Sequence, residues 1–138
     1  MTHDDRVAEV RERVDDSTFH RNFGMRLEHV AEGEVDLSLE AGSEHLNLMG
    51  TVHGGVLATL ADSATGLAYR TVLEPGMTFT TIQLSLTYLT AGRAGRIVAR
   101  GRVVKRGRRT GYAEADVVDG QERLLARATA LLAVMPES

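Results

Sequence analysis

The chain has 138 residues, of which 43% are hydrophobic and 25% are charged, and its formal net charge is -3. These values are typical of a globular domain with its own core, and they exclude disordered and fibrous classes. The acidic balance speaks against a general nucleic-acid binder, and the absence of cysteine excludes disulfides, thiolate metal sites and a cysteine nucleophile.

The apolar runs and the N-terminus bear on location. No apolar run approaches the roughly 18 residues that a membrane-spanning helix needs, and the N-terminus is acidic where a signal peptide would be basic and then apolar. We therefore expect one domain over residues 1–138, no membrane association and a cytoplasmic location. Valines at helical spacing after a capping Thr2 predict a short amphipathic helix over about residues 3–15.

Alternating residues predict an antiparallel sheet. In residues 34–40 every second residue is apolar, which is typical of a half-buried strand, and Gly33 indicates a hairpin with residues 26–31. A similar alternation continues after the middle of the chain, in residues 80–88. One side of that run holds Thr80, Ile82, Leu84, Leu86 and Tyr88. Three more strands are expected over residues 96–105, 110–118 and 123–134.

Between the two groups of strands, residues 54 to about 72 follow a helical period. One face is apolar, and a second stripe of mostly small residues includes Asp62. We predict an α+β fold in which an antiparallel sheet of about six strands carries one long core helix. Such a sheet has edges to protect and cannot close around the helix within one chain, so pairing with a second copy is expected.

The start of this helix and its small-residue stripe carry the candidate chemistry. Gly54 and Gly55 lie where backbone N–H groups lack internal partners and the helix dipole is positive, so a carbonyl oxygen docked there would be polarised. Asp62 follows among small residues, which favours a partly buried general base or nucleophile over a solvated acid. Together they indicate acyl chemistry, while His53 is either a helix cap or a member of the site.

Other chemistries find little support. His45, His53 and Asp62 lack the spacing of a recognised zinc site, and no HExxH is present, so we expect no metal. Ser63 is not in a G-x-S-x-G elbow, which speaks against a serine hydrolase. The chain has no Walker A or G-x-G-x-x-G sequence, and no cofactor is expected.

A basic segment occupies the tip of a predicted hairpin. It is either a solubilising turn or a clamp for the phosphates of a ligand, and with Arg93 and Arg96 it would steer a polyanion such as coenzyme A. Its members are Lys105, Arg106, Arg108 and Arg109.

At this point the sequence resembles the acyl-CoA thioesterases of the hotdog fold, and among them the PaaI type of the phenylacetate pathway. The resemblance covers about residues 20–134, and it is carried by Asn-x-x-Gly-x-x-His-Gly-Gly over residues 47–55, followed by the helical acid Asp62. It implies a sheet wrapped around the central helix. It also implies a homodimer with a continuous joint sheet and active sites at the dimer interface, with two such dimers usually forming a homotetramer.

The resemblance also implies roles for single residues. Asp62 resembles the catalytic acid that activates water or attacks the thioester directly. Gly54 resembles the residue whose N–H holds the thioester oxygen, with His53 in support. Asn47 resembles the amide that the partner subunit supplies to orient water or the carbonyl group.

Two positions of the motif are less regular. Relatives often carry a hydroxyl residue on the strand after the helix, and Thr81 fits that role best, with Thr80 as a near alternative. Gly66 departs from related aryl-CoA enzymes, which can carry a hydroxyl residue there.

We therefore expect hydrolysis of an acyl-CoA with a small or aromatic acyl group to the free acid and CoA, without a cofactor. One alternative is a hotdog dehydratase or hydratase acting on enoyl-CoA, but such sites resemble an Asp that precedes a nearby His, and here the order is reversed. The other alternative is a non-catalytic module that binds or senses acyl-CoA. Asp62 separates it from an enzyme, because a binding module needs no acid beside the carbonyl site.

Overall fold

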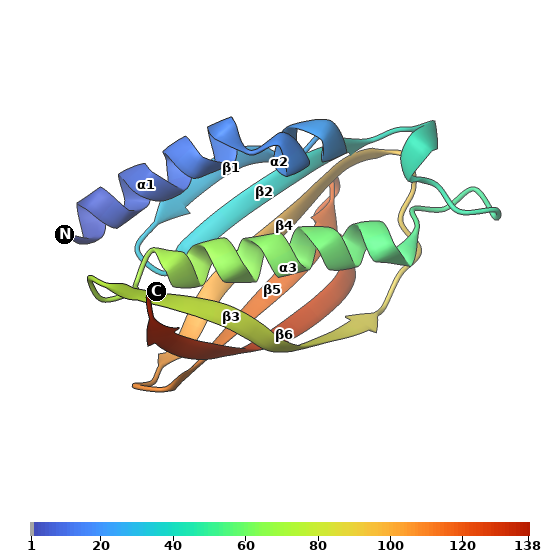
Figure 1. The fold of residues 1–138 in the computed structure, drawn as a ribbon. Coiled ribbons are helices and arrows are strands. Elements are labelled where there is room, and N and C mark those ends of the chain that lie inside the picture. Colours follow the sequence, from blue (N-terminus) through green and yellow to red (C-terminus); the bar gives the residue numbers. More distant parts are fainter. Residues whose placement is uncertain (1) are drawn as a thin grey trace.

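The computed structural model describes residues 2–138, and it contains one six-stranded sheet with a long helix lying across one face (Figure 1). The helices are α1 (His3–Asp16), α2 (Thr18–Phe23) and α3 (Gly54–Arg70), and a short 3-10 turn covers Ser43–His45. The strands are β1 (Arg26–Ala31), β2 (Glu34–Ala41), β3 (Met77–Tyr88), β4 (Gly95–Arg106), β5 (Thr110–Asp119) and β6 (Leu124–Pro136).

All neighbouring strands of the sheet are antiparallel, in the order β1-β2-β4-β5-β6-β3. The sheet curves around α3, which packs most closely on β4, β5 and β2 (Figure 1). The expected α+β architecture, a hotdog fold with a sheet wrapped around one central helix, is confirmed. β3 stands at one edge of the sheet with no further strand beside it among residues 2–138.

The face of α3 that meets the sheet is made of small and aliphatic residues. Leu60, Ala61, Ala64 and Ala68 have no exposed surface, and short side chains at these positions bring the helix backbone close to the strands. At the closest approach the sheet has a glycine, Gly101 of β4, where a Cβ atom would collide with the carbonyl oxygen of Ala64. The position of α3 therefore depends on the absence of a side chain in β4.

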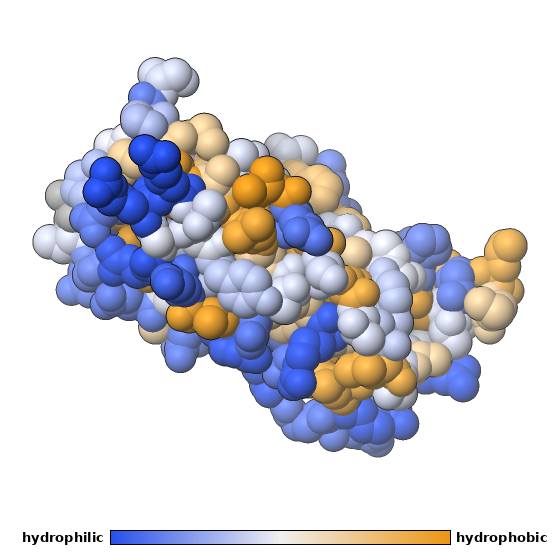
Figure 2. Space-filling view, turned by 90° about the horizontal axis from the view of Figure 1, so that it is seen from below, coloured by the Kyte–Doolittle hydropathy of each residue, from blue (hydrophilic) through white to orange (hydrophobic). Residues whose placement is uncertain are grey.

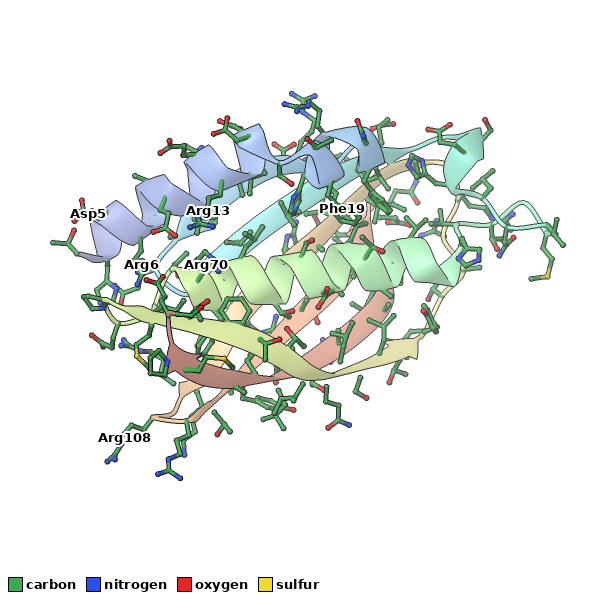
Figure 3. The ribbon with its side chains drawn as sticks, viewed as in Figure 1. Asp5, Arg6, Arg13, Phe19, Arg70 and Arg108 are labelled. Carbon is green, nitrogen blue, oxygen red and sulfur yellow. The ribbon has the colours of Figure 1, made fainter. Side chains whose placement is uncertain are left out.

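The N-terminal segment covers the β1 and β2 side of the sheet and differs in part from the expectation. After α1, the chain forms a second helix, α2, which the sequence analysis did not anticipate. Ser17 caps it by accepting a hydrogen bond from the His20 N–H (3.2 Å), and Gly24 ends it in the left-handed conformation (φ 92°). Arg6, only 3% exposed, ties α1 to the end of α3 by donating to the Leu73 carbonyl (3.2 Å) (Figure 3).

β3 begins at Met77, before the expected residue 80, and its alternation is interrupted. The register with β6 shifts between Thr81 and Gln83, so Ile82 is bulged. Thr81 pairs with the fully buried Leu132 and therefore shares its helix-facing side, whereas Thr80 is exposed on the other side. Placing Thr80 and Ile82 on one side with the leucines that follow was wrong, because the bulge reverses the alternation.

Candidate functional site

The N-terminus of α3 gives the two adjacent glycines different roles. His53 is the helix cap, and its Nδ1 accepts a hydrogen bond from the Gly55 N–H at 2.9 Å. The ring proton must then reside on Nε2, because Nδ1 acts as the acceptor. The N–H of Gly54 donates to no group of residues 2–138. Of the two glycine N–H groups at the positive end of the helix, only that of Gly54 is therefore free within the described chain.

Tyr88, at the end of β3, holds Gly54 in place and was not singled out by the sequence analysis. Its hydroxyl donates to the Gly54 carbonyl at 2.8 Å, and a Cβ atom on Gly54 would lie 3.0 Å from that hydroxyl oxygen. Both residues line an open pocket of about 320 Å³ together with Leu57 and the start of the β3–β4 loop. The sequence offered one signal for it, a tyrosine at the end of the expected strand over residues 80–88.

Asp62 lies two turns further along α3. The sequence predicted a partly buried carboxylate, but in the single chain this residue is exposed. The protein around it nevertheless removes enough water to raise the pKa of the Asp62 carboxyl above its ordinary value. The carboxylate forms no hydrogen bond or ion pair within residues 2–138, so nothing in the chain neutralises it. An acid of this kind can accept a proton or attack an electrophile.

Beyond Asp62, the face of α3 that lies above β3 lacks a side chain at one position. Gly66 lies one turn after Asp62, and a Cβ atom there would be 3.4 Å from the Phe79 ring of β3. Arg70, one turn further, places its guanidinium 5.4 Å from the centre of the same ring. Thr81 lies on the same side of β3 as the Phe79 ring, because the two residues are two positions apart and the register shift comes only after Thr81. Asp62, Gly66 and Arg70 thus share one face of α3 above β3.

Asn47 stands in the loop before α3, and its amide group holds that loop together. Its Oδ1 accepts hydrogen bonds from the N–H groups of Met49 (2.9 Å) and Thr51 (3.1 Å), and its Nδ2 donates to the Thr51 hydroxyl (2.9 Å). Only one Nδ2 hydrogen remains for any other partner. The loop projects away from the body of the molecule (Figure 1).

The candidate groups do not meet within one chain. Gly54 and Asp62 are eight residues apart on α3, which is about 12 Å along a helix axis. A single thioester carbonyl cannot reach both, because attack needs contact within about 3.5 Å. The candidate groups therefore fall into two candidate half-sites on each chain: a donor half with Gly54 and Asn47 at the start of α3 and in the loop before it, and an acid half around Asp62.

The basic candidates are divided as well. Arg93 follows Gly92, which lines the Gly54 pocket, and it forms no ion pair within residues 2–138. The β4–β5 hairpin lies at the other end of α3, where Arg106 pairs with Glu74 at 2.6 Å. Arg108 extends from its tip, away from the body (Figure 3). Lys105 and Arg109 are also exposed, without ion pairs inside the described chain.

Comparisons with known proteins decide the family. The model of the thioesterase superfamily matches residues 49–126, which include the end of the projecting loop, all of α3 and the strands β3, β4 and β5. The chain belongs to the thioesterase superfamily. A candidate esterase of Halobacterium salinarum is 37% identical over 120 residues, covering 83% of this chain and 79% of that protein. Human acyl-coenzyme A thioesterase 13 is 29% identical over 116 residues, covering 80% of this chain and 82% of that protein.

A solved structure agrees with this membership. A mutant of the phenylacetic acid degradation protein PaaI from Thermus thermophilus is 33% identical, with a TM-score of 0.78, and the match covers 85% of this chain and 98% of that one. The PaaI resemblance is confirmed, and the thioesterase is an enzyme of thioester hydrolysis, with acyl-CoA thioesterase activity at the level of the family. Within residues 2–138 no helix is long and apolar enough to cross a membrane.

Proposed function

We propose that this thioesterase hydrolyses an acyl-CoA with a small or aromatic acyl group to the free acid and CoA. Asp62 acts as general base or nucleophile, and the Gly54 N–H polarises the thioester carbonyl. The observation that carries the proposal is the pairing, on one helix, of an unengaged N–H at the N-terminus with an unpaired carboxylate whose pKa is raised. These are the two groups that acyl transfer from an activated thioester requires.

The active unit in this proposal is a homodimer, because one chain cannot bring the two half-sites together. Two copies that join their β3 edges about a two-fold axis must run antiparallel. The Tyr88 end of one β3 then lies toward the Met77 end of the other, near the C-terminal half of the second α3. Gly54 of one copy thereby approaches Asp62 of the other. Two such dimers forming a tetramer, and a cytoplasmic location, complete the proposal.

The chemistry then proceeds across the interface. The thioester oxygen rests on the Gly54 N–H, and Asp62 of the second copy takes a proton from water as that water attacks the carbonyl carbon. The tetrahedral intermediate collapses and expels the CoA thiolate, which is protonated to the thiol. In the alternative route Asp62 attacks directly, and water then hydrolyses the resulting anhydride. Both routes consume one water and release the same acid and CoA.

Supporting roles follow from position. His53 caps the helix and so keeps the N-terminal turn ordered, while its neighbour Gly55 lies at the same mouth. The remaining Nδ2 hydrogen of Asn47 is available to the carbonyl or the water, as the resemblance implies. Thr81 of the copy that supplies Asp62 lies on the helix-facing side of β3, which favours it over Thr80 as the hydroxyl of the site.

The antiparallel arrangement also bears on the CoA phosphates. The basic hairpin belongs to the C-terminal end of α3, and the two-fold axis brings that end of one copy toward the N-terminal end of the other. A CoA entering beside Gly54 and Arg93 of one copy would then meet the hairpin of its partner. In that arrangement the phosphate-binding cations are Arg93, Lys105, Arg106, Arg108 and Arg109.

A thiol-release assay over a panel of acyl-CoAs tests the proposal. Wild type should cleave small or aromatic thioesters, and Asp62→Asn, which keeps the size of the side chain, should lose at least about 100-fold in kcat. Full turnover by Asp62→Asn would exclude the mechanism. Mass measurement in solution should find dimers or tetramers, and a monomer with full activity would exclude the shared site. Cell fractionation tests the location.

The second candidate is a member of the family that has lost hydrolysis and only binds acyl-CoA, and the exposure of Asp62 in the single chain is the observation that favours it. If calorimetry shows that wild type binds acyl-CoA and no thiol is released from any thioester, that function replaces hydrolysis. Enoyl-CoA belongs in the same panel, because its hydration without thiol release would instead indicate a hydratase.

A further inference from the structure

The most exposed large hydrophobic side chains of residues 2–138 are two neighbours, Leu48 and Met49, with relative exposures of 106% and 82%. They form the tip of the loop that projects beyond α3, and hydrophobic atoms mark the outermost end of the molecule on that side (Figures 1 and 2). Neither side chain packs against a hydrophobic cluster of residues 2–138. Exposed apolar groups that protrude in this way are typical of an interface.

The loop is built to hold this tip in one conformation. Leu46 and Val52 form an isolated antiparallel bridge at its base, and the Asn47 N–H donates to the Thr51 carbonyl at 2.8 Å. Gly50 turns the chain at φ 80°, a conformation that L side chains rarely adopt. With the three hydrogen bonds of the Asn47 amide, these contacts leave little freedom at the tip. A preorganised apolar tip loses little entropy when it docks.

The β3 edge indicates where the tip goes. The Tyr88 hydroxyl donates to the Gly54 carbonyl at 2.8 Å, so the end of β3 and the base of the loop are neighbours. In an antiparallel β3 pair, the loop of one copy therefore points over the beginning of β3 and the C-terminal half of α3 in the other. That region offers the Phe79 ring beside Gly66, where the helix has no side chain to fill the space.

We propose that Leu48 and Met49 of one subunit cover the Asp62 half-site of the second copy and form one wall of its acyl pocket. The inference rests on the proposed dimer and adds to it two residues supplied in trans. They exclude water from Asp62, which is exposed in the single chain, and contact the apolar part of the acyl group. In this arrangement the Asn47 amide is also a positioning group, because its hydrogen bonds within the loop shape the segment that presents Leu48 and Met49.

Mixing two variants tests the inference. Asp62→Asn lacks the acid but keeps the apolar tip, and the double variant Leu48→Ser/Met49→Ser keeps the acid but lacks the tip. The tip variant should lose about tenfold or more in kcat/KM, because it no longer buries two apolar side chains against the second copy. Heterodimers from co-expression with two different tags should recover about half of the wild-type turnover, since one of their two sites is intact.

Recovery is expected only if the tip acts on the other subunit. If the tip served its own chain, both sites of the heterodimer would be damaged, and the absence of recovery would overturn the inference. Full activity of the tip variant as a homodimer would also overturn it. Val104→Ser is the matched control, because Val104 is another exposed apolar residue (51%) on β4 and should leave turnover unchanged.

A second readout keeps the inference separate from the catalytic proposal. Analytical ultracentrifugation should show that the tip variant has a dimer dissociation constant at least about tenfold above wild type. If wild type hydrolyses no acyl-CoA but the tip variant dissociates, the proposed function fails and the trans contact stands. If the dissociation constant and the turnover are both unchanged, the trans contact fails.

Discussion

Gly54→Ala separates stability from catalysis in this thioesterase. The new methyl carbon would lie 3.0 Å from the Tyr88 hydroxyl oxygen and 3.1 Å from Cζ of the same ring, so one of the two must move by a few tenths of an ångström. Tyr88 is 54% exposed and stands at the end of a strand, so its ring can swing outward. That movement breaks the hydrogen bond from the hydroxyl to the Gly54 carbonyl, which measures 2.8 Å.

The effect on stability should be small. Losing the hydrogen bond costs about 0.5 to 1.5 kcal/mol, and alanine in place of glycine in a helix returns up to about 1 kcal/mol. The free energy of unfolding of Gly54→Ala should therefore stay within about 1.5 kcal/mol of wild type. The effect on turnover should be larger, because alanine keeps the N–H but the new methyl group and the loss of the Tyr88 contact displace it from the oxyanion, and full loss of such a donor lowers kcat about 100- to 1000-fold.

Urea denaturation and a thiol-release assay on the same preparation measure both quantities. We expect Gly54→Ala to unfold close to wild type and to lose about 100-fold in kcat. Gly120→Ala is the control, since this glycine lies in the turn between β5 and β6, outside the candidate site, and its methyl group would meet Cβ of Arg96 at 3.7 Å, an ordinary contact. Near-normal kcat in Gly54→Ala would refute the claim that the Tyr88 contact sets the position of this N–H, whereas global unfolding would refute the account of Tyr88.

Three further outcomes are expected. Because desolvation raises the folded-state pKa of Asp62, ionisation of this carboxyl opposes folding, and Asp62→Asn should be more stable to urea than wild type at pH 7. The difference in stability should vanish below about pH 3.9, where the carboxyl is protonated in the unfolded chain too, and equal stability at pH 7 would contradict this expectation. Gly101→Ala should lower the free energy of unfolding by about 3 kcal/mol or more in the same assay, because its methyl group collides with the Ala64 backbone. A decrease below about 1 kcal/mol would show that α3 shifts freely. Arg6→Met should reduce the free energy of unfolding by about 2 to 4 kcal/mol and so lower the melting temperature, since the Leu73 carbonyl loses a buried donor. An unchanged melting temperature would contradict the importance of that contact.

The main elements of this fold could be predicted because their signals are local. The helical period of α3 and the alternation in β2 are set by neighbours within a few residues, and each pattern allows one mode of burial. The spacing from Asn47 through Gly54 to Asp62 likewise carried the family, because a loop that enters a helix is a continuous piece of chain. The short helix α2 was missed, as six residues hold too little pattern to stand out.

Tertiary structure decided what depends on residues far apart in sequence. The bulge at Ile82 is a matter of register between β3 and β6, and it alone chooses Thr81 over Thr80 for the helix-facing side. The capture of the Gly55 N–H by His53 left Gly54 with the free donor. Helix length separated that donor from Asp62 by about 12 Å, which is why a second copy enters the proposed mechanism. Sequence determined which groups are present, whereas their pairings depend on distances that only the folded chain defines.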